Sequence, residues 1–295
     1  MRDIQAMGTF TNYLSLVKFS HTIFALPFAI IGFLLGVSFT NASIDWKLFI
    51  LVILCMIFAR NAAMGFNRYT DRSIDQANPR TSSREIPAGI VSPISAILFV
   101  IVNCALFIST TYFINSICFY LSPIALILIL GYSLSKRYTF LCHLILGIGL
   151  SLAPIGAYIA VSEQFAVIPI IFSLIVLFWV SGFDIIYALQ DKAFDESQQL
   201  KSIPVKIGLK ASMVLSSFLH GIVVILIVAA GYYANLGIYY WIGSCIFIGL
   251  LTYQHIIVKA DDLSKVTLAF FTTNGIASVV FAFFFALDLF LIGNL

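Results

Sequence analysis

The sequence predicts an all-α, polytopic membrane protein with about nine transmembrane helices, and three observations support this fold class. Hydrophobic residues make up 61% of the 295 positions and charged residues only 10%, whereas a soluble domain carries about 25% charged residues. Apolar runs of the length needed to cross a bilayer recur along the whole chain, which has a mean hydropathy of +1.05. Basic residues are concentrated in alternate connecting segments. We treat residues 1–295 as a single transmembrane domain.

Nine segments are apolar enough to cross a hydrocarbon core in a helix of about 20 residues. They are residues 22–42, 46–66, 91–110, 113–132, 141–161, 165–188, 211–233, 237–257 and 267–292. The segments expected on the N-terminal side of the membrane are 1–21, 67–90, 133–140, 189–210 and 258–266, and they hold 14 of the 16 Lys and Arg residues. The positive-inside rule therefore predicts a cytoplasmic N-terminus and, after nine crossings, a C-terminus outside.

Overall charge and cysteine usage exclude some functions. A net charge of +3 without one basic patch gives no reason to expect a nucleic-acid partner. The five cysteines lie in apolar runs without metal-ligand spacing. The four histidines occur singly, so we interpret them as structural. Chemistry is instead expected in the two longest cytoplasmic loops, about 67–90 and 189–210.

The first of these loops begins with a motif of regularly spaced polar residues. Asn67, Asp71 and Asp75 recur every four positions and would share one face of a helix. Carboxylates at this spacing repel each other, so the pattern makes sense if a cation lies between them. The alternative is a solvated helix end with Arg68 and Arg72 as local counter-ions.

A second acidic motif lies at the end of the sixth predicted span. Asp184, Tyr187, Asp191 and Asp195 are spaced by three, four and four residues, again on one helical face. Asp184 is expected at the membrane boundary, where ionisable groups are costly and usually functional. Two carboxylate motifs on one side of the membrane predict a shared divalent-metal site. Oxygen ligands without nearby His or Cys favour Mg²⁺ or Mn²⁺, and Mg²⁺ usually bridges carboxylates to phosphate oxygens, which indicates a diphosphate substrate.

Basic side chains beside these motifs are candidates for binding the diphosphate. Alternatively, each could serve only to fix the orientation of the helices in the membrane. The candidates are Lys18, Arg72, Arg84, Lys136, Arg137 and Lys201. Arg80 and Lys206 carry further positive charge in the same loops.

The two motifs together resemble the UbiA superfamily of intramembrane aromatic prenyltransferases, whose signature is NxxxDxxxD followed by DxxxD, often within DxxYxxxDxxxD. Further similar segments are 18–29, 78–81, 86–89, 132–137 and 153–157. Arg68 stands where many members have Asp, so position 68 is not carried over as a ligand. The resemblance implies Mg²⁺ ligation by Asn67, Asp71, Asp75, Asp191 and Asp195. It implies catalytic roles for Asp71, Asp184, Tyr187 and Asp191.

The resemblance also implies a fold and a reaction. The helices would surround a central cavity with the motifs at its cytoplasmic mouth and an opening to membrane lipid. The chain would be a transferase of a bacterial inner membrane that joins a polyprenyl diphosphate to an aromatic acceptor. The expected acceptor is 4-hydroxybenzoate, in ubiquinone biosynthesis, and the alternative is a dihydroxynaphthoate, in menaquinone biosynthesis.

A cation-coupled transporter is an alternative of a different class, because transporters also place acidic groups in membrane helices. Transport sites lie near the bilayer midplane on broken helices, whereas these carboxylates cluster at helix ends beside basic residues. Their position therefore favours the enzyme.

Overall fold

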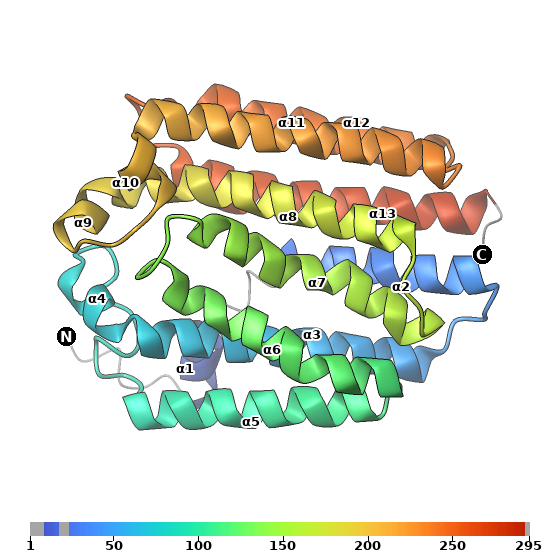
Figure 1. Ribbon diagram of the computed structural model, residues 1–295, viewed down its shortest axis with the longest axis horizontal. Coiled ribbons are helices and arrows are strands. Elements are labelled where there is room, and N and C mark those ends of the chain that lie inside the picture. Colours follow the sequence, from blue (N-terminus) through green and yellow to red (C-terminus); the bar gives the residue numbers. More distant parts are fainter. Residues whose placement is uncertain (1–8, 18–23, 293–295) are drawn as a thin grey trace.

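A computed structural model describes residues 9–17 and 24–292, and long helices dominate it (Figure 1). Nine of the helices in this part of the chain lie side by side as one bundle. They are α2 (Leu26–Thr40), α3 (Trp46–Thr70), α5 (Pro93–Tyr112), α6 (Ser116–Ser135), α7 (Cys142–Ser162), α8 (Val167–Ala188), α11 (Leu209–Tyr233), α12 (Ile238–Ile257) and α13 (Asn274–Leu291). The short helices are α1 (Thr9–Leu16), α4 (Arg72–Ala77), α9 (Lys192–Ser197) and α10 (Ile203–Ile207).

The predicted all-α membrane fold is confirmed. Eight helices in the described residues are long and apolar enough to cross a membrane, and α2 is a shorter apolar helix. Each predicted span corresponds to one of these nine helices. The predicted span 22–42 begins in residues outside the described part, and α2 itself covers Leu26–Thr40.

Local sequence signals set several helix starts. The side chain of Asp45 caps α3 by accepting hydrogen bonds from the backbone N–H groups of Lys47 (2.8 Å) and Leu48 (3.2 Å). Ser92 caps α5 in the same way and is followed by Pro93, whose fixed φ suits the first helical position. These caps satisfy backbone donors that a membrane protein cannot leave unpaired in an apolar surrounding.

The centre of the bundle is aromatic. Trp179 of α8 contacts Phe28 of α2 and Phe247 of α12, with ring centroids 5.3 and 5.6 Å apart. Helices α2 and α7 approach closely because Gly32 has no side chain: a Cβ there would overlap the backbone carbonyl of Pro154. Close approach through small residues is a common way to pack helices in lipid, where burial of apolar surface gives little driving force.

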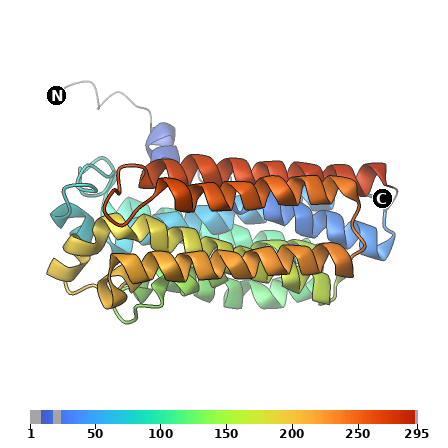
Figure 2. The same cartoon turned by 90° about the horizontal axis from the view of Figure 1, so that it is seen from above.

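Short helices and long connections gather at one end of the bundle. Figures 1 and 2 both show α4, α9 and α10 at the end opposite the C-terminus. The two predicted active-site loops therefore lie at the same end, although more than 100 positions separate their motifs along the chain. This end is where a site can be assembled from both loops.

Candidate active site

The first acidic motif lies where α3 meets α4. Helix α3 ends at Thr70, and Asp71 joins it to α4. The backbone N–H of Asp71 still donates to the carbonyl of Asn67 (2.9 Å) and that of Asp75 to Asp71 (2.7 Å), so the four-residue spacing persists across the junction. Asp71 and Asp75 are both buried, each residue being 4% exposed. The Asn67 amide donates to Asp71 Oδ2 at 3.2 Å.

The second motif does not occupy one continuous helix. Asp184 and Tyr187 belong to α8, a 3₁₀ turn covers Leu189–Asp191, and Asp195 lies in α9. The single helical face expected from the spacing is therefore interrupted, because a 3₁₀ turn has about three residues per turn instead of 3.6. The interruption turns the chain at the end of the bundle while leaving all four side chains on the same cavity.

Both motifs border one cavity of about 650 Å³ that extends into the bundle. Its polar end is lined by the motif residues Asn67, Asp71, Asp75, Asp184, Tyr187, Asp191 and Asp195. Most of the rest of its lining is apolar and comes from α3, α6 and α7, including Val52, Leu128 and Leu150. The cavity thus has one charged end, and the larger part of it is apolar.

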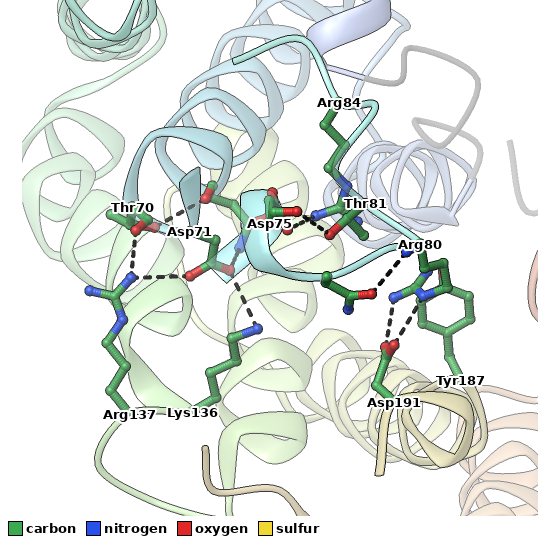
Figure 3. Close-up of polar contacts among 12 residues, drawn as sticks. Thr70, Asp71, Asp75, Arg80, Thr81, Arg84, Lys136, Arg137, Tyr187 and Asp191 are labelled. Atoms are coloured by element: carbon green, nitrogen blue, oxygen red, sulfur yellow. Dashed lines mark hydrogen bonds and ion pairs between the residues drawn. The ribbon is translucent and has the colours of Figure 1, made fainter. Parts of the chain in front are cut away.

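Buried carboxylates at the charged end are paired with basic side chains (Figure 3). Asp71 lies 3.2 Å from Arg137 Nη2 and 3.6 Å from Lys136 Nζ. Asp75 lies 2.7 Å from Arg84 Nη1. Burial raises the pKa of Asp71 above its usual value, and the nearby charge of Asp75 adds to this, while Lys136 and Arg137 act in the opposite direction. Lys136 and Arg137 therefore offset part of the effect of burial on Asp71.

Arg80 connects the two motifs. Its Nε and Nη2 donate to the two carboxylate oxygens of Asp191 at 2.9 and 2.6 Å, and its Nη1 donates to the Tyr187 hydroxyl at 2.9 Å (Figure 3). Burial alone would lower the pKa of Arg80, but Asp191 and Tyr187 outweigh it and raise that pKa. The Asn78 side chain shapes the turn by accepting from the Arg80 backbone N–H at 2.9 Å.

Sequence reasoning counted Arg80 among the cations that could neutralise leaving-group charge, but it did not include Arg80 among the diphosphate-binding candidates. The signal that could have identified it is the segment Asn78-Pro79-Arg80-Thr81, which already carried part of the family resemblance. Of the predicted candidates, Arg84 and Lys136 line the cavity and Arg137 reaches it through Asp71.

Two other predicted diphosphate candidates, Arg72 and Lys201, lie away from the cavity lining. Arg72 lies over the ring of Tyr69, 4.6 Å from its centroid, and donates to the Tyr69 carbonyl at 2.7 Å. Lys201 donates to the carbonyl of Tyr138 at 3.1 Å. Neither is among the described residues that line the cavity. Lys18 lies outside the described residues.

His143 is a site residue that sequence reasoning missed. We interpreted it as structural, but its Nδ1 lies 2.7 Å from Asp184 Oδ2, and both residues line the cavity. The pair joins α7 to α8 across 41 positions, so no local spacing indicates it. Its effect is to hold one oxygen of Asp184 in a fixed direction.

Comparison with known proteins identifies the family. A sequence profile of the UbiA prenyltransferase family matches residues 25–290. The chain belongs to the UbiA prenyltransferase family. Its structure is similar to that of a UbiA homolog from Aeropyrum pernix K1, with a TM-score of 0.79 and 28% identity over 92% of this chain and 98% of that chain.

Named relatives of this UbiA chain include two bacterial enzymes. It is 29% identical over 239 residues to a 4-hydroxybenzoate octaprenyltransferase of Aliivibrio fischeri, covering 80% of this chain and 82% of the relative. It is 28% identical over 238 residues to one of Shewanella oneidensis, with coverage of 80% and 82%. The predicted family and the enzyme class, an aromatic prenyltransferase, are confirmed.

The donor set of this UbiA site suits Mg²⁺. Asp75 Oδ2 is buried without a hydrogen-bond partner, and the other motif donors are carboxylate and amide oxygens, which hard cations prefer. Among the described residues, no three His, Cys, Asp or Glu side chains are close enough to hold a metal ion by themselves. Mg²⁺ normally takes only one or two carboxylates and completes its shell with water and phosphate oxygens. The residues therefore fit an ion that a diphosphate helps to hold.

Proposed function

We propose that this UbiA enzyme transfers a polyprenyl group from a polyprenyl diphosphate to the ring of 4-hydroxybenzoate, with Mg²⁺, in respiratory quinone biosynthesis. The observation that carries the proposal is the cavity of about 650 Å³, which has acidic and basic groups at one end and a mostly apolar lining elsewhere, as an isoprenoid diphosphate would need. Two relatives named 4-hydroxybenzoate octaprenyltransferase support the acceptor. A fold neighbour from Archaeoglobus fulgidus, 22% identical with a TM-score of 0.74, was solved bound to GPP and Mg²⁺.

Asn67, Asp71, Asp75, Asp191 and Asp195 would hold Mg²⁺. Bound there, the ion would neutralise negative charge on the diphosphate. Arg80, Arg84 and Lys136 line the same end and would bind the diphosphate oxygens. When the C1–O bond breaks, its electron pair leaves with the diphosphate. A ring carbon of the acceptor then bonds to C1 and loses its proton. Asp184 lines the cavity and has one oxygen paired with His143, and its other oxygen would accept that proton.

Arg60 supports an acceptor that carries a carboxylate. It lies on α3 seven residues before Asn67, about two turns deeper on the same face, and lines the cavity. Its Nε is buried without a hydrogen-bond partner. A charged group inside a membrane span is costly unless it finds an opposite charge. The carboxylate of an aromatic acid would supply that charge.

We expect Arg60→Leu to raise the KM for 4-hydroxybenzoate by about 10- to 100-fold, the value of one charged hydrogen bond, while the KM for the prenyl diphosphate changes little. Initial rates of the purified protein with labelled diphosphate check this. A phenol without the carboxylate is the control: wild type and variant should use it equally poorly. An unchanged KM for 4-hydroxybenzoate would contradict this role of Arg60.

The acceptor itself is tested by product mass. Membranes receive the labelled diphosphate with either 4-hydroxybenzoate or a dihydroxynaphthoate, the menaquinone precursor that remains the second candidate. Prenylated 4-hydroxybenzoate is the expected product. Product from the naphthoate alone would transfer the proposal to menaquinone biosynthesis, and the absence of product with either ring would overturn it.

We further propose that the active-site end faces the cytoplasm of a bacterial cell and that the C-terminus is outside. The cytoplasmic loops predicted from charge include the connections that carry α4, α9 and α10, and these lie together at one end of the bundle (Figure 1). In a variant without native cysteines, Ser83→Cys should react with an impermeant maleimide only in ruptured cells. Gln164→Cys, between α7 and α8, should react in intact cells. The reverse pattern would invert the topology.

A further inference from the structure

Residues Leu268–Thr273 form a short π-helix, η3, that continues directly into α13. We call this single turn of π-helix the π-turn. A π-turn inserts one extra residue into a helix and disturbs the i→i+4 hydrogen bonds, so it is rare and is often found at functional sites. This one lies at the same end of the bundle as the acidic motifs, because its residue Phe270 contacts Tyr187 of the second motif.

Asn274 stabilises the π-turn and ties it to two neighbouring helices. Its side chain is fully buried. Nδ2 donates to the carbonyls of Ala269 (3.0 Å) and Phe270 (3.1 Å), both within the π-turn. Oδ1 accepts from Trp179 Nε1 of α8 (2.9 Å) and from Gln254 Nε2 of α12 (3.3 Å). One amide therefore fixes the π-turn relative to α8, the helix that carries Asp184 and Tyr187.

The π-turn places two successive aromatic rings at the cavity. Phe270 and Phe271 both line it. The centroid of the Phe270 ring lies 4.1 Å from the ring centroid of Tyr187 and 5.2 Å from the ring centroid of Phe183. Since the Tyr187 hydroxyl accepts a hydrogen bond from Arg80, this aromatic cluster adjoins the polar end where the diphosphate is proposed to bind.

Chemistry at this boundary has two requirements. As the C1–O bond breaks, positive charge develops on the allylic carbons, and aromatic faces attract positive charge. Water must also be kept from C1, because it would capture the allylic carbon and release a prenyl alcohol instead of the prenylated ring. Rings at the junction of the polar and apolar parts of the cavity meet both requirements.

We propose that Asn274 is a positioning residue for prenyl transfer: it holds the π-turn so that Phe270 and Phe271 cover the allylic end of the prenyl diphosphate. The inference rests on the proposed function and adds to it the groups that shield the reacting carbon. Asn274 itself is not among the residues that line the cavity. It acts through the backbone carbonyls of the π-turn.

The test compares the two fates of the prenyl group in Asn274→Leu, which keeps the side-chain size but removes the amide. We expect kcat to fall about 10-fold or more with little change in the KM for the diphosphate, because the diphosphate-binding groups are untouched. We also expect a larger share of the substrate to become prenyl alcohol, measured by mass in the same reactions. Ser216→Ala is the control, since it removes a different buried hydrogen bond, to the carbonyl of Gly182 at 2.7 Å.

A second pair of variants keeps the test valid if Asn274→Leu does not fold. Phe270→Leu removes the ring but keeps apolar bulk, and we expect the same rise in prenyl alcohol. Phe270→Tyr keeps an aromatic ring at this position. Its ratio of prenylated acceptor to prenyl alcohol should therefore be close to that of wild type. A folded Phe270→Leu or Asn274→Leu enzyme with the wild-type ratio would overturn the inference. Wild-type protein that forms no product would instead overturn the proposed function and the inference with it.

Discussion

Replacing Asp71 with Asn is expected to lower kcat/KM for the prenyl diphosphate by at least about 100-fold, the scale of losing one preorganised electrostatic group in an active site. Asp71 is buried and touches Lys136 and Arg137, and it is one of the proposed Mg²⁺ ligands. The Asn side chain keeps the shape but removes the negative charge. Initial rates measured over a range of Mg²⁺ concentrations check the prediction. Weaker metal binding should raise the Mg²⁺ concentration that gives half-maximal activity.

Asp261→Asn is the matched control for this change. Asp261 is an exposed acid in the connection between α12 and the π-turn, and it does not line the cavity among the described residues. The activity of the Asp261→Asn enzyme should stay within about twofold of wild type, as expected for a surface substitution. Wild-type rates and an unchanged Mg²⁺ dependence in a folded Asp71→Asn protein would contradict the metal-site proposal.

Arg80→Ala is expected to lower kcat/KM for the diphosphate by about 30- to 100-fold, because it removes a bidentate, charge-assisted contact that joins the motifs. The contacts to Asp191 and Tyr187 are lost together. Arg80→Lys should recover only part of the activity, since an ammonium group cannot reproduce the planar fork. The measurement is the initial rate against diphosphate concentration at saturating acceptor.

Arg72→Ala is the corresponding control. The sequence alone suggested Arg72 as a diphosphate-binding residue, whereas the structure places Arg80 at the cavity. Arg72 carries the same charge in the same loop but lies on Tyr69, away from the cavity lining. Its rates should remain within about threefold of wild type, as for a solvent-screened surface charge. A larger loss in Arg72→Ala than in Arg80→Ala would mean that the diphosphate binds differently from the arrangement proposed here.

Much of the fold could be predicted because it depends on properties of short segments. An apolar run of about 20 residues forms a membrane-crossing helix whatever its neighbours are, since backbone polar groups in lipid must be satisfied within the segment. Residues three or four apart lie on one helical face for equally local reasons. For this reason Asn67, Asp71 and Asp75 were recognisable as a group. The 3₁₀ turn at Leu189–Asp191 was not, because it arises where the chain turns at the end of the bundle.

The sequence by itself thus determined the helices, the family and the acidic residues of the candidate site. Tertiary structure decided which partners these acids have: Arg80 for Asp191 and His143 for Asp184. It also revealed the amide of Asn274 within the π-turn. Such contacts join positions up to 111 residues apart. They follow from how helices pack, and packing is not encoded in the spacing of residues along any single segment.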